Sequence, residues 1–166
     1  MPHPIPAAVA AYLPHLTAAL VGCLGDHLVG LALFGSSARG TAKAGSDIDI
    51  LLVVQASGAE VDAAIARAIA AVRCLPEAGA LSRLEVDPTP ALLVQSLARF
   101  AGHPLILLDI VCEGQILADP RALLRRHFEG VRAGIRRNGS LRVWQPDGTW
   151  YWDLKPGMRA GEEVAF

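Results

Sequence analysis

The chain has 166 residues, 52% of them hydrophobic but only 5% aromatic, and a formal net charge of −1. This length favours one domain over 1–166 with an aliphatic core. The near-neutral charge gives no general case for a nucleic-acid or membrane partner, and the wholly apolar runs are far shorter than the ~20 residues of a membrane span. The N-terminus lacks the basic segment of a signal peptide. The three cysteines have no zinc-site spacing and are expected to be buried free thiols in a reducing cytoplasm.

The first half of the chain contains two apolar runs between two helical patterns. Apolar residues at helical spacing predict the helices, the first with a kink at Pro14. Ser57 and Glu60 form a capping-box pattern at the start of the second. The predicted elements are a helix over 6–26, a strand over 28–34, a strand over 47–54 and a helix from 57 to about 75.

The second half is predicted from short apolar runs and from proline and glycine signals. Pro90 suits the first turn of a helix, and Asp147-Gly148 is typical of a hairpin turn. The predicted elements are a strand over 81–87, helices over 91–101 and 103–113, a strand over 115–118, a helix over 121–137 and a hairpin over 141–154.

Two aspartates open the second predicted strand. Successive side chains of a strand point to opposite faces, so Asp47 and Asp49 share one face while Ile48 and Ile50 share the other. The two carboxylates repel each other, and a hard divalent cation such as Mg²⁺ removes that repulsion. We therefore expect Asp47 and Asp49 to be metal ligands, the alternative being two solvated aspartates in a hairpin.

The connector between these strands has the composition of a phosphate-binding loop. Gly35 allows close approach of the backbone to a ligand, and Ser36 and Ser37 are expected to open a helical turn whose N–H groups face an anion. Arg39 adds a positive charge for phosphate, unless it is simply solvated. Ser46 precedes the first aspartate and is expected to cap or orient it.

Gly35-Ser36, ten further residues and then Asp47-x-Asp49 resemble the signature of the nucleotidyltransferase superfamily. The Ser-Ala-Arg-Gly and Gly-Ser-Asp-Ile-Asp segments are similar to those of its small stand-alone branch, the minimal nucleotidyltransferases. The resemblance implies an α/β fold in which a small mixed sheet is flanked by helices. It places the catalytic core at about 28–118, with a C-terminal helix and β-hairpin in 119–166. It also implies Mg²⁺ as cofactor and ATP as substrate.

The superfamily uses a third carboxylate on a neighbouring strand as metal ligand or general base. Two candidates lie on the outward face of the strand predicted over 81–87, namely Glu85 and Asp87. We favour Glu85, because it lies in mid-strand, whereas Asp87 adjoins Pro88, where the strand ends.

For minimal nucleotidyltransferases the resemblance implies transfer of AMP from ATP to a hydroxyl group, often a tyrosine of a helical partner toxin that is thereby silenced. One alternative is a transferase for a small molecule such as an aminoglycoside, and another is a non-catalytic partner-binding module. The arginines of the helix over 121–137 are either a solvated face or a docking surface. Trp150 and Trp152 are expected on one face of the hairpin.

Overall fold

The computed structural model describes residues 4–102, 105–159, 161–164 and 166. The chain forms two compact units, residues 1–125 and residues 126–166. In chain order the elements are α1 (Ala7–Leu24), the 3-10 helix η1 (Gly25–His27), β1 (Leu28–Phe34), α2 (Gly35–Arg39), β2 (Asp49–Val54), α3 (Ala59–Arg73), α4 (Pro76–Arg83), β3 (Ala91–Ser96), α5 (Leu97–Ala101), α6 (Ile106–Glu113), β4 (Gln115–Ala118), α7 (Leu123–Asn138), β5 (Leu141–Trp144) and β6 (Trp150–Asp153).

A four-stranded mixed sheet organises the first unit, in the order β3-β2-β1-β4. β1 is antiparallel to both β2 and β4, whereas β3 is parallel to β2. The register places Asp49 of β2 beside Phe34 of β1 on one side and beside Ala91 of β3 on the other. The predicted α/β class, with a small mixed sheet flanked by helices, is confirmed.

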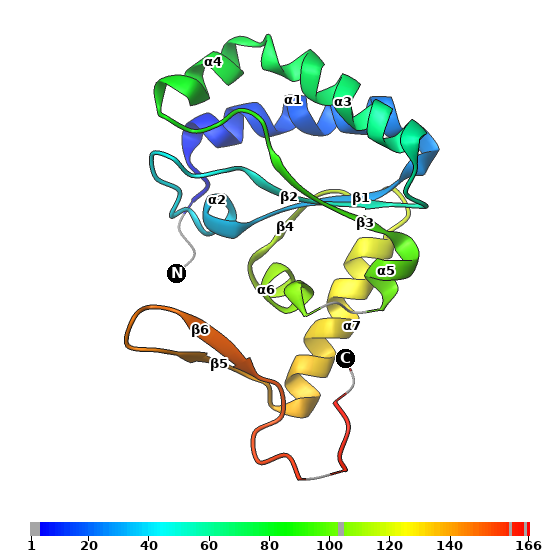
Figure 1. Cartoon of the computed structure of the whole chain (residues 1–166), viewed down its shortest axis with the longest axis vertical. Helices are drawn as coiled ribbons and strands as arrows, with labels where there is room; N and C mark the ends of the chain where they lie inside the picture. The colour runs from blue at the N-terminus through cyan, green and yellow to red at the C-terminus, as the bar shows by residue number, and fades with distance from the viewer. Residues whose placement is uncertain (1–3, 103–104, 160, 165) are drawn as a thin grey trace. The chain divides into compact units, whose positions relative to one another are not determined.

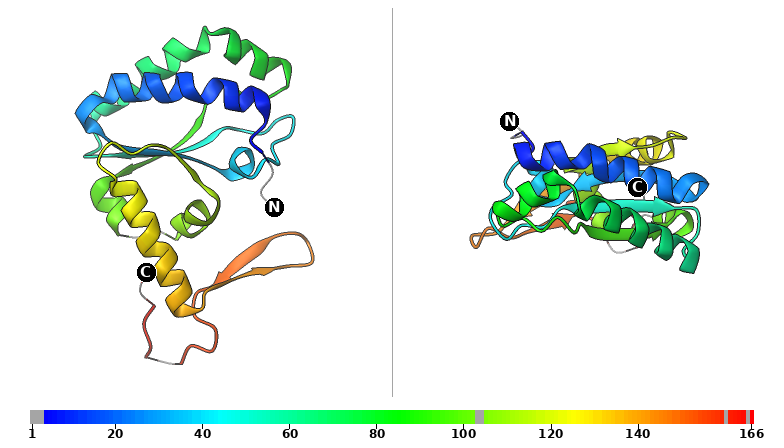
Figure 2. Two further views of the ribbon diagram at one scale, coloured as in Figure 1. Left: turned by 180° about the vertical axis from the view of Figure 1, so that it is seen from behind. Right: turned by 90° about the horizontal axis from the view of Figure 1, so that it is seen from above.

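Helices cover both faces of this sheet. On one face lie α1, α3 and α4 (Figure 1), and α1 runs alongside α3 when the molecule is seen from behind (Figure 2). Their core takes in the alternate β2 residues Ile50, Leu52 and Val54. The intervening residues Leu51 and Val53 point to the opposite face, where α5 and α6 lie.

Within the described residues, α1 is the longest and most apolar helix. By length and composition alone, the segment Ala7–His27 is able to cross a membrane, with a mean hydropathy of 1.6, and it is the one such helix in the part of the chain that the structure describes. Six of its side chains are buried in the core, and the helix continues through Pro14. Core helices of soluble proteins and leader sequences have the same length and composition, so these two properties alone do not identify a membrane-spanning helix.

Between residues 76 and 101 the sequence prediction is wrong. The expected strand over 81–87 is the end of α4 and a following turn, since Pro76 at the first helical position and Glu77 in the first turn start a helix there. The expected helix over 91–101 is β3 followed by the short helix α5. An apolar run of this length fits either structure, and parallel pairing with β2 decides for a strand.

Smaller differences concern helix ends and thiols. Gly58, not Ser57, is the N-cap of α3, and it has no side-chain cap. The predicted start of the helix over 103–113 lies outside the described residues, but its end at Gly114 is confirmed. None of the three cysteines forms a disulfide, yet Cys74 and Cys112 are exposed rather than buried.

The second unit contains most of α7 and a two-stranded hairpin, and both were predicted. Arg142 pairs with Trp152 in the register and Trp144 with Trp150, so these four side chains share one face, as expected for the two tryptophans. The Arg142 guanidinium lies 5.2 Å from the ring centroid of Trp150 and 5.3 Å from that of Trp152. This cation–π stacking orders one face of the hairpin.

Candidate nucleotide site

The aspartate pair lies at the start of β2, on the face away from α1, α3 and α4. Ile48 and Ile50 are fully buried in the core, whereas Asp47 is exposed and Asp49 half-buried. β2 begins at Asp49 rather than at Asp47, but the alternation of faces is the one predicted from the sequence. The two carboxylates are therefore neighbours on one side of the chain.

The environment of Asp49 opposes its charged form. Burial raises the pKa of the Asp49 carboxyl above its usual range, and the adjacent Asp47 raises this pKa further, while the positive charge of Arg39 lowers it. A nearby cation would stabilise the charged form of this carboxylate, because it offsets both the lost hydration and the repulsion from Asp47.

Gly35 is required at its position by Asp49 itself. Its φ of +69° is a left-handed conformation that side chains disfavour. A Cβ at residue 35 would overlap the Oδ2 atom of Asp49 and lie 2.8 Å from its Cγ atom. The sequence suggested that this glycine leaves room for a ligand, but its nearest neighbour is the carboxylate of Asp49.

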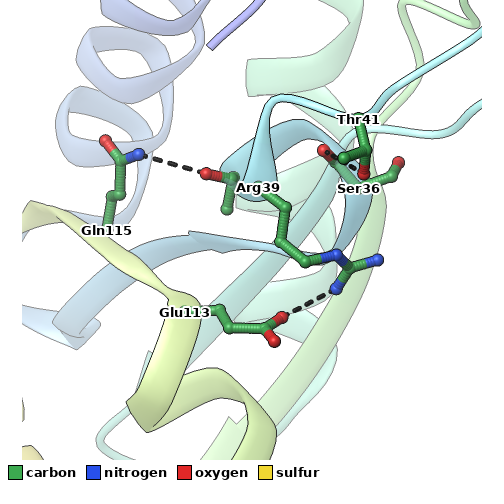
Figure 3. Close-up of polar contacts among 6 residues, drawn as sticks. Ser36, Arg39, Thr41, Glu113 and Gln115 are labelled. Carbon is green, nitrogen blue, oxygen red and sulfur yellow. Dashed lines mark hydrogen bonds and ion pairs between the residues drawn. The ribbon is translucent and has the colours of Figure 1, made fainter. Parts of the chain in front are cut away.

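The predicted helical turn after Gly35 is confirmed as α2, and its two serines differ. Ser37 is fully buried, and its hydroxyl donates to the backbone oxygen of Asp47 at 3.4 Å. Ser36 is half-buried, and its carbonyl accepts hydrogen bonds from the amide and the hydroxyl of Thr41 (Figure 3). Ser37 thus fixes the connector to the aspartate pair, whereas Ser36 holds Thr41 through its carbonyl.

Ser46 belongs to a tight turn of the connector. Its hydroxyl accepts a hydrogen bond from the Lys43 amide at 2.8 Å, and its own amide donates to the Lys43 carbonyl at 3.0 Å. These two hydrogen bonds fix the conformation of the connector directly before Asp47.

Glu85 does not lie on a strand. It follows α4 with a φ of +57°, and the next amide, that of Val86, donates back to the Leu81 carbonyl at 3.1 Å. This is the left-handed position that ends a helix in a Schellman motif. No group of three acidic, histidine or cysteine residues able to hold a metal ion occurs among the described residues, so Asp47, Asp49 and Glu85 do not form a three-ligand set.

The second candidate for the third carboxylate is also engaged elsewhere. Asp87 accepts a hydrogen bond from the Thr89 amide at 2.7 Å, and its charge acts on Tyr12 of α1. The residue that lies beside Asp49 on the neighbouring strand is Ala91, and the sequence of β3, Ala-Leu-Leu-Val-Gln-Ser, contains no acid. The strand that should carry a third carboxylate lacks one.

Arg39 has a partner that could not be inferred from the sequence. Its Nη1 atom lies 2.8 Å from the Oε2 atom of Glu113 at the end of α6, and Gln115 at the start of β4 donates to the carbonyl of Ala38 at 3.3 Å. Both contacts join residues more than 70 positions apart (Figure 3). The pairing of β4 with β1 brings these residues together.

Two adjacent aspartate carboxylates fit the way that proteins hold Mg²⁺. This ion is commonly bound through one or two carboxylates together with substrate phosphates and water, all of them oxygen ligands. Asp47 and Asp49 would hold the ion, and the raised pKa of Asp49 marks a carboxylate that a cation would stabilise in its charged form.

Comparison with known proteins identifies a family for part of the chain. Residues 23–87 match the family described as nucleotidyltransferase domain, which confirms the resemblance seen in the sequence. No curated protein matches the chain. The chain is similar to a crystal structure of a mutant toxin-antitoxin MntA-HpeT (17% identity, 71% of this chain and 82% of that chain covered, TM-score 0.40). It is also similar to a crystal structure of a toxin-antitoxin with AMP-PNP (18% identity, 73% and 87% covered, TM-score 0.41).

Proposed function

We propose that this chain is a Mg²⁺-dependent nucleotidyltransferase that moves AMP from ATP to a hydroxyl group. In this reaction the hydroxyl oxygen forms a bond to the α-phosphorus, the α–β phosphoanhydride bond breaks, pyrophosphate leaves and the hydroxyl proton ends in solvent. The observation that carries the proposal is the pair of neighbouring carboxylates of Asp47 and Asp49, the second packed against Gly35 of α2, within the segment that matches a nucleotidyltransferase domain.

The residues of this site have separate tasks in the proposed reaction. Asp47 and Asp49 hold the metal ion, which supplies charge neutralisation at the phosphates when it is bound. The hydroxyl of Ser36 and the guanidinium of Arg39 bind phosphate oxygens, while Ser37 and Ser46 hold the connector in shape. The chain thus contributes positioning and charge, which are the main requirements of phosphoryl-group chemistry.

For the acceptor we propose a tyrosine hydroxyl of a partner toxin, in the cytoplasm. This part of the proposal rests on the resemblance of the motif to minimal nucleotidyltransferases, and a small molecule such as an aminoglycoside is the alternative acceptor.

A second candidate function is nucleotide binding without transfer. It is favoured by β3, on which Ala91 stands beside Asp49, and by the position of Glu85 at the end of α4. Without a positioned base, transfer would lose about 10²–10⁴-fold in rate. A chain of this kind would act by occluding its partner.

One experiment separates the two functions. The protein is incubated with Mg²⁺, cell lysate and ATP labelled at its α-phosphate, and nucleotide affinity is measured in parallel by calorimetry. Label on a protein or small molecule supports transfer, whereas binding without label supports the second function, and absence of both excludes both. The Asp47→Asn/Asp49→Asn variant should lose label and binding, and Asp62→Asn, which removes an exposed carboxylate of α3, should lose neither.

A further inference from the structure

Two residues of the junction between α6 and β4 contact the helix α2. Glu113 is the last residue of α6, Gly114 follows it, and Gln115 is the first residue of β4. Glu113 contacts Arg39, and Gln115 contacts Ala38 (Figure 3). The last two residues of α2 are therefore held by side chains from the edge strand β4 and from the helix that precedes it.

Gly114 allows the α6–β4 junction to approach β1 closely. A Cβ at residue 114 would overlap the carbonyl oxygen of Ile110 and lie 3.2 Å from the carbonyl oxygen of Leu33. Leu33 is paired with Gln115 across the β1–β4 ladder. A larger residue at this point would push the end of α6 away from β1, and with it the Glu113 carboxylate.

Glu113 occupies only part of the Arg39 side chain. A guanidinium has five N–H donors, and within the described residues the Glu113 carboxylate is the one partner of this guanidinium, through Nη1 at 2.8 Å. The Arg39 side chain keeps 36% of its surface exposed, whereas that of Glu113 keeps 17%. Part of the Arg39 side chain is thus accessible while its position is fixed by a mostly buried carboxylate.

Arg39 also lies near Asp49. It ends the five-residue helix α2, whose first residue, Gly35, packs against the Asp49 carboxylate, and its positive charge acts on that carboxylate. An arginine free in solvent would spread this charge over many rotamers.

We propose that Glu113 is a positioning residue of the nucleotide site, which holds the Arg39 guanidinium beside the Asp47–Asp49 pair so that its remaining N–H groups bind a nucleotide phosphate. Gln115 supports the same arrangement by fixing the end of α2. The inference rests on the proposed function, because it needs a nucleotide at this site. The opposite role, in which Glu113 competes with phosphate for Arg39, predicts an effect of opposite sign.

The test measures the affinity of α,β-methylene-ATP with Mg²⁺ by calorimetry, since this analogue binds but cannot be cleaved. Glu113→Gln keeps the shape of the side chain and removes its charge, and it should weaken affinity about tenfold. Glu113→Asp keeps the charge with a shorter reach and should recover part of the loss. The Arg39→Ala/Glu113→Gln double variant should bind no more weakly than Arg39→Ala alone, because each change abolishes the same Arg39–Glu113 interaction.

A second measurement needs no nucleotide. The Nε–H signal of Arg39 in NMR spectra should report an ordered side chain in the wild type and a mobile one in Glu113→Gln. Glu162→Gln is the matched control, because Glu162 pairs with Lys155 at 3.0 Å in the second unit. This control should change neither the Arg39 signal nor the affinity.

The outcomes separate this inference from the proposed function. Nucleotide binding by the wild type with unchanged or tighter affinity in Glu113→Gln overturns the inference alone. An equally ordered Arg39 in that variant also overturns it. Absence of nucleotide binding by the wild type overturns the proposed function and the inference together.

Discussion

Asp49 has a structural cost that its proposed role as a metal ligand would offset. In the protein without ligand, burial and the neighbouring Asp47 raise the pKa of Asp49, so the folded state favours the protonated carboxyl. The associated stability is present below the unfolded pKa of about 3.9 and is lost as the pH rises through the folded pKa. At neutral pH the charged carboxylate therefore lowers stability.

We expect Asp49→Asn to raise the melting temperature of the ligand-free protein at pH 7 and to lose Mg²⁺–nucleotide binding. The gain should fall away as the pH is lowered below about 4, where the wild-type carboxyl is itself neutral. Thermal melts from pH 3 to pH 8 measure this. Asp62→Asn on α3 is the control, and a lower melting temperature for Asp49→Asn at pH 7 would contradict the account.

A second prediction at the residue scale concerns Gly35. Gly35→Ala adds a Cβ that overlaps the Asp49 carboxylate and forces a side chain into a left-handed conformation. Gly45→Ala is a matched control, because Gly45 has a φ of +78° but no atom within 4 Å of an added Cβ. Backbone strain alone should cost about 1–3 kcal/mol in both variants. Urea denaturation should show a larger loss for Gly35→Ala, and Asp49→Ala should restore part of it.

At the scale of elements, β3 supplies the test of the missing carboxylate. Ala91→Asp would place an acid beside Asp49 in the parallel register. Like charges side by side destabilise a sheet, so the ligand-free variant should melt below the wild type, while Mg²⁺ should raise its melting temperature more than that of the wild type. Ala98→Asp, on the exposed side of α5, should show no such response. An equal response of the two variants to Mg²⁺ would count against a metal site here.

The elements around the motif were predictable because local signals agreed. An apolar run ended by Gly35 specified β1, and alternation of aspartate and isoleucine specified the face of Asp49. The segment from 76 to 101 was not predictable, because short apolar runs fit helix or strand equally well and the parallel partner β2 decides the outcome. The misplacement of Glu85 follows from that error, and the Arg39–Glu113 contact depends on pairing between distant segments.

At the scale of the whole molecule, Tyr12 ties the N-terminal helix to the chain beyond α4. Tyr12 is fully buried, and its hydroxyl donates to the Pro88 carbonyl at 2.7 Å. Burial, with a contribution from Asp87 and against the opposing effect of Arg73, raises the pKa of Tyr12 to about 12. The stability that this group contributes is complete below about pH 10, the unfolded value, and is lost as the pH rises through the folded value.

Alkaline unfolding tests this connection. Tyr12→Phe should lower the free energy of unfolding by about 1 kcal/mol at pH 7, where the hydrogen bond is lost. Between pH 10 and 12 the wild type should lose stability faster than the variant, so that the difference shrinks or reverses. Urea unfolding at several pH values measures both curves. Tyr151→Phe, at a half-exposed position of β6, should follow the wild type, and parallel curves for Tyr12→Phe and wild type would refute the assignment.

The overlap between Gly35 and Asp49 also limits how the chain can evolve. Because the Asp49 carboxylate fills the space of a Cβ at residue 35, a mutation at either position changes which residues the other accepts. In a library in which both codons are randomised, side chains at residue 35 should survive selection for folding chiefly where residue 49 has become small. A lineage that gave up metal binding would lose the steric demand for this glycine together with the aspartate.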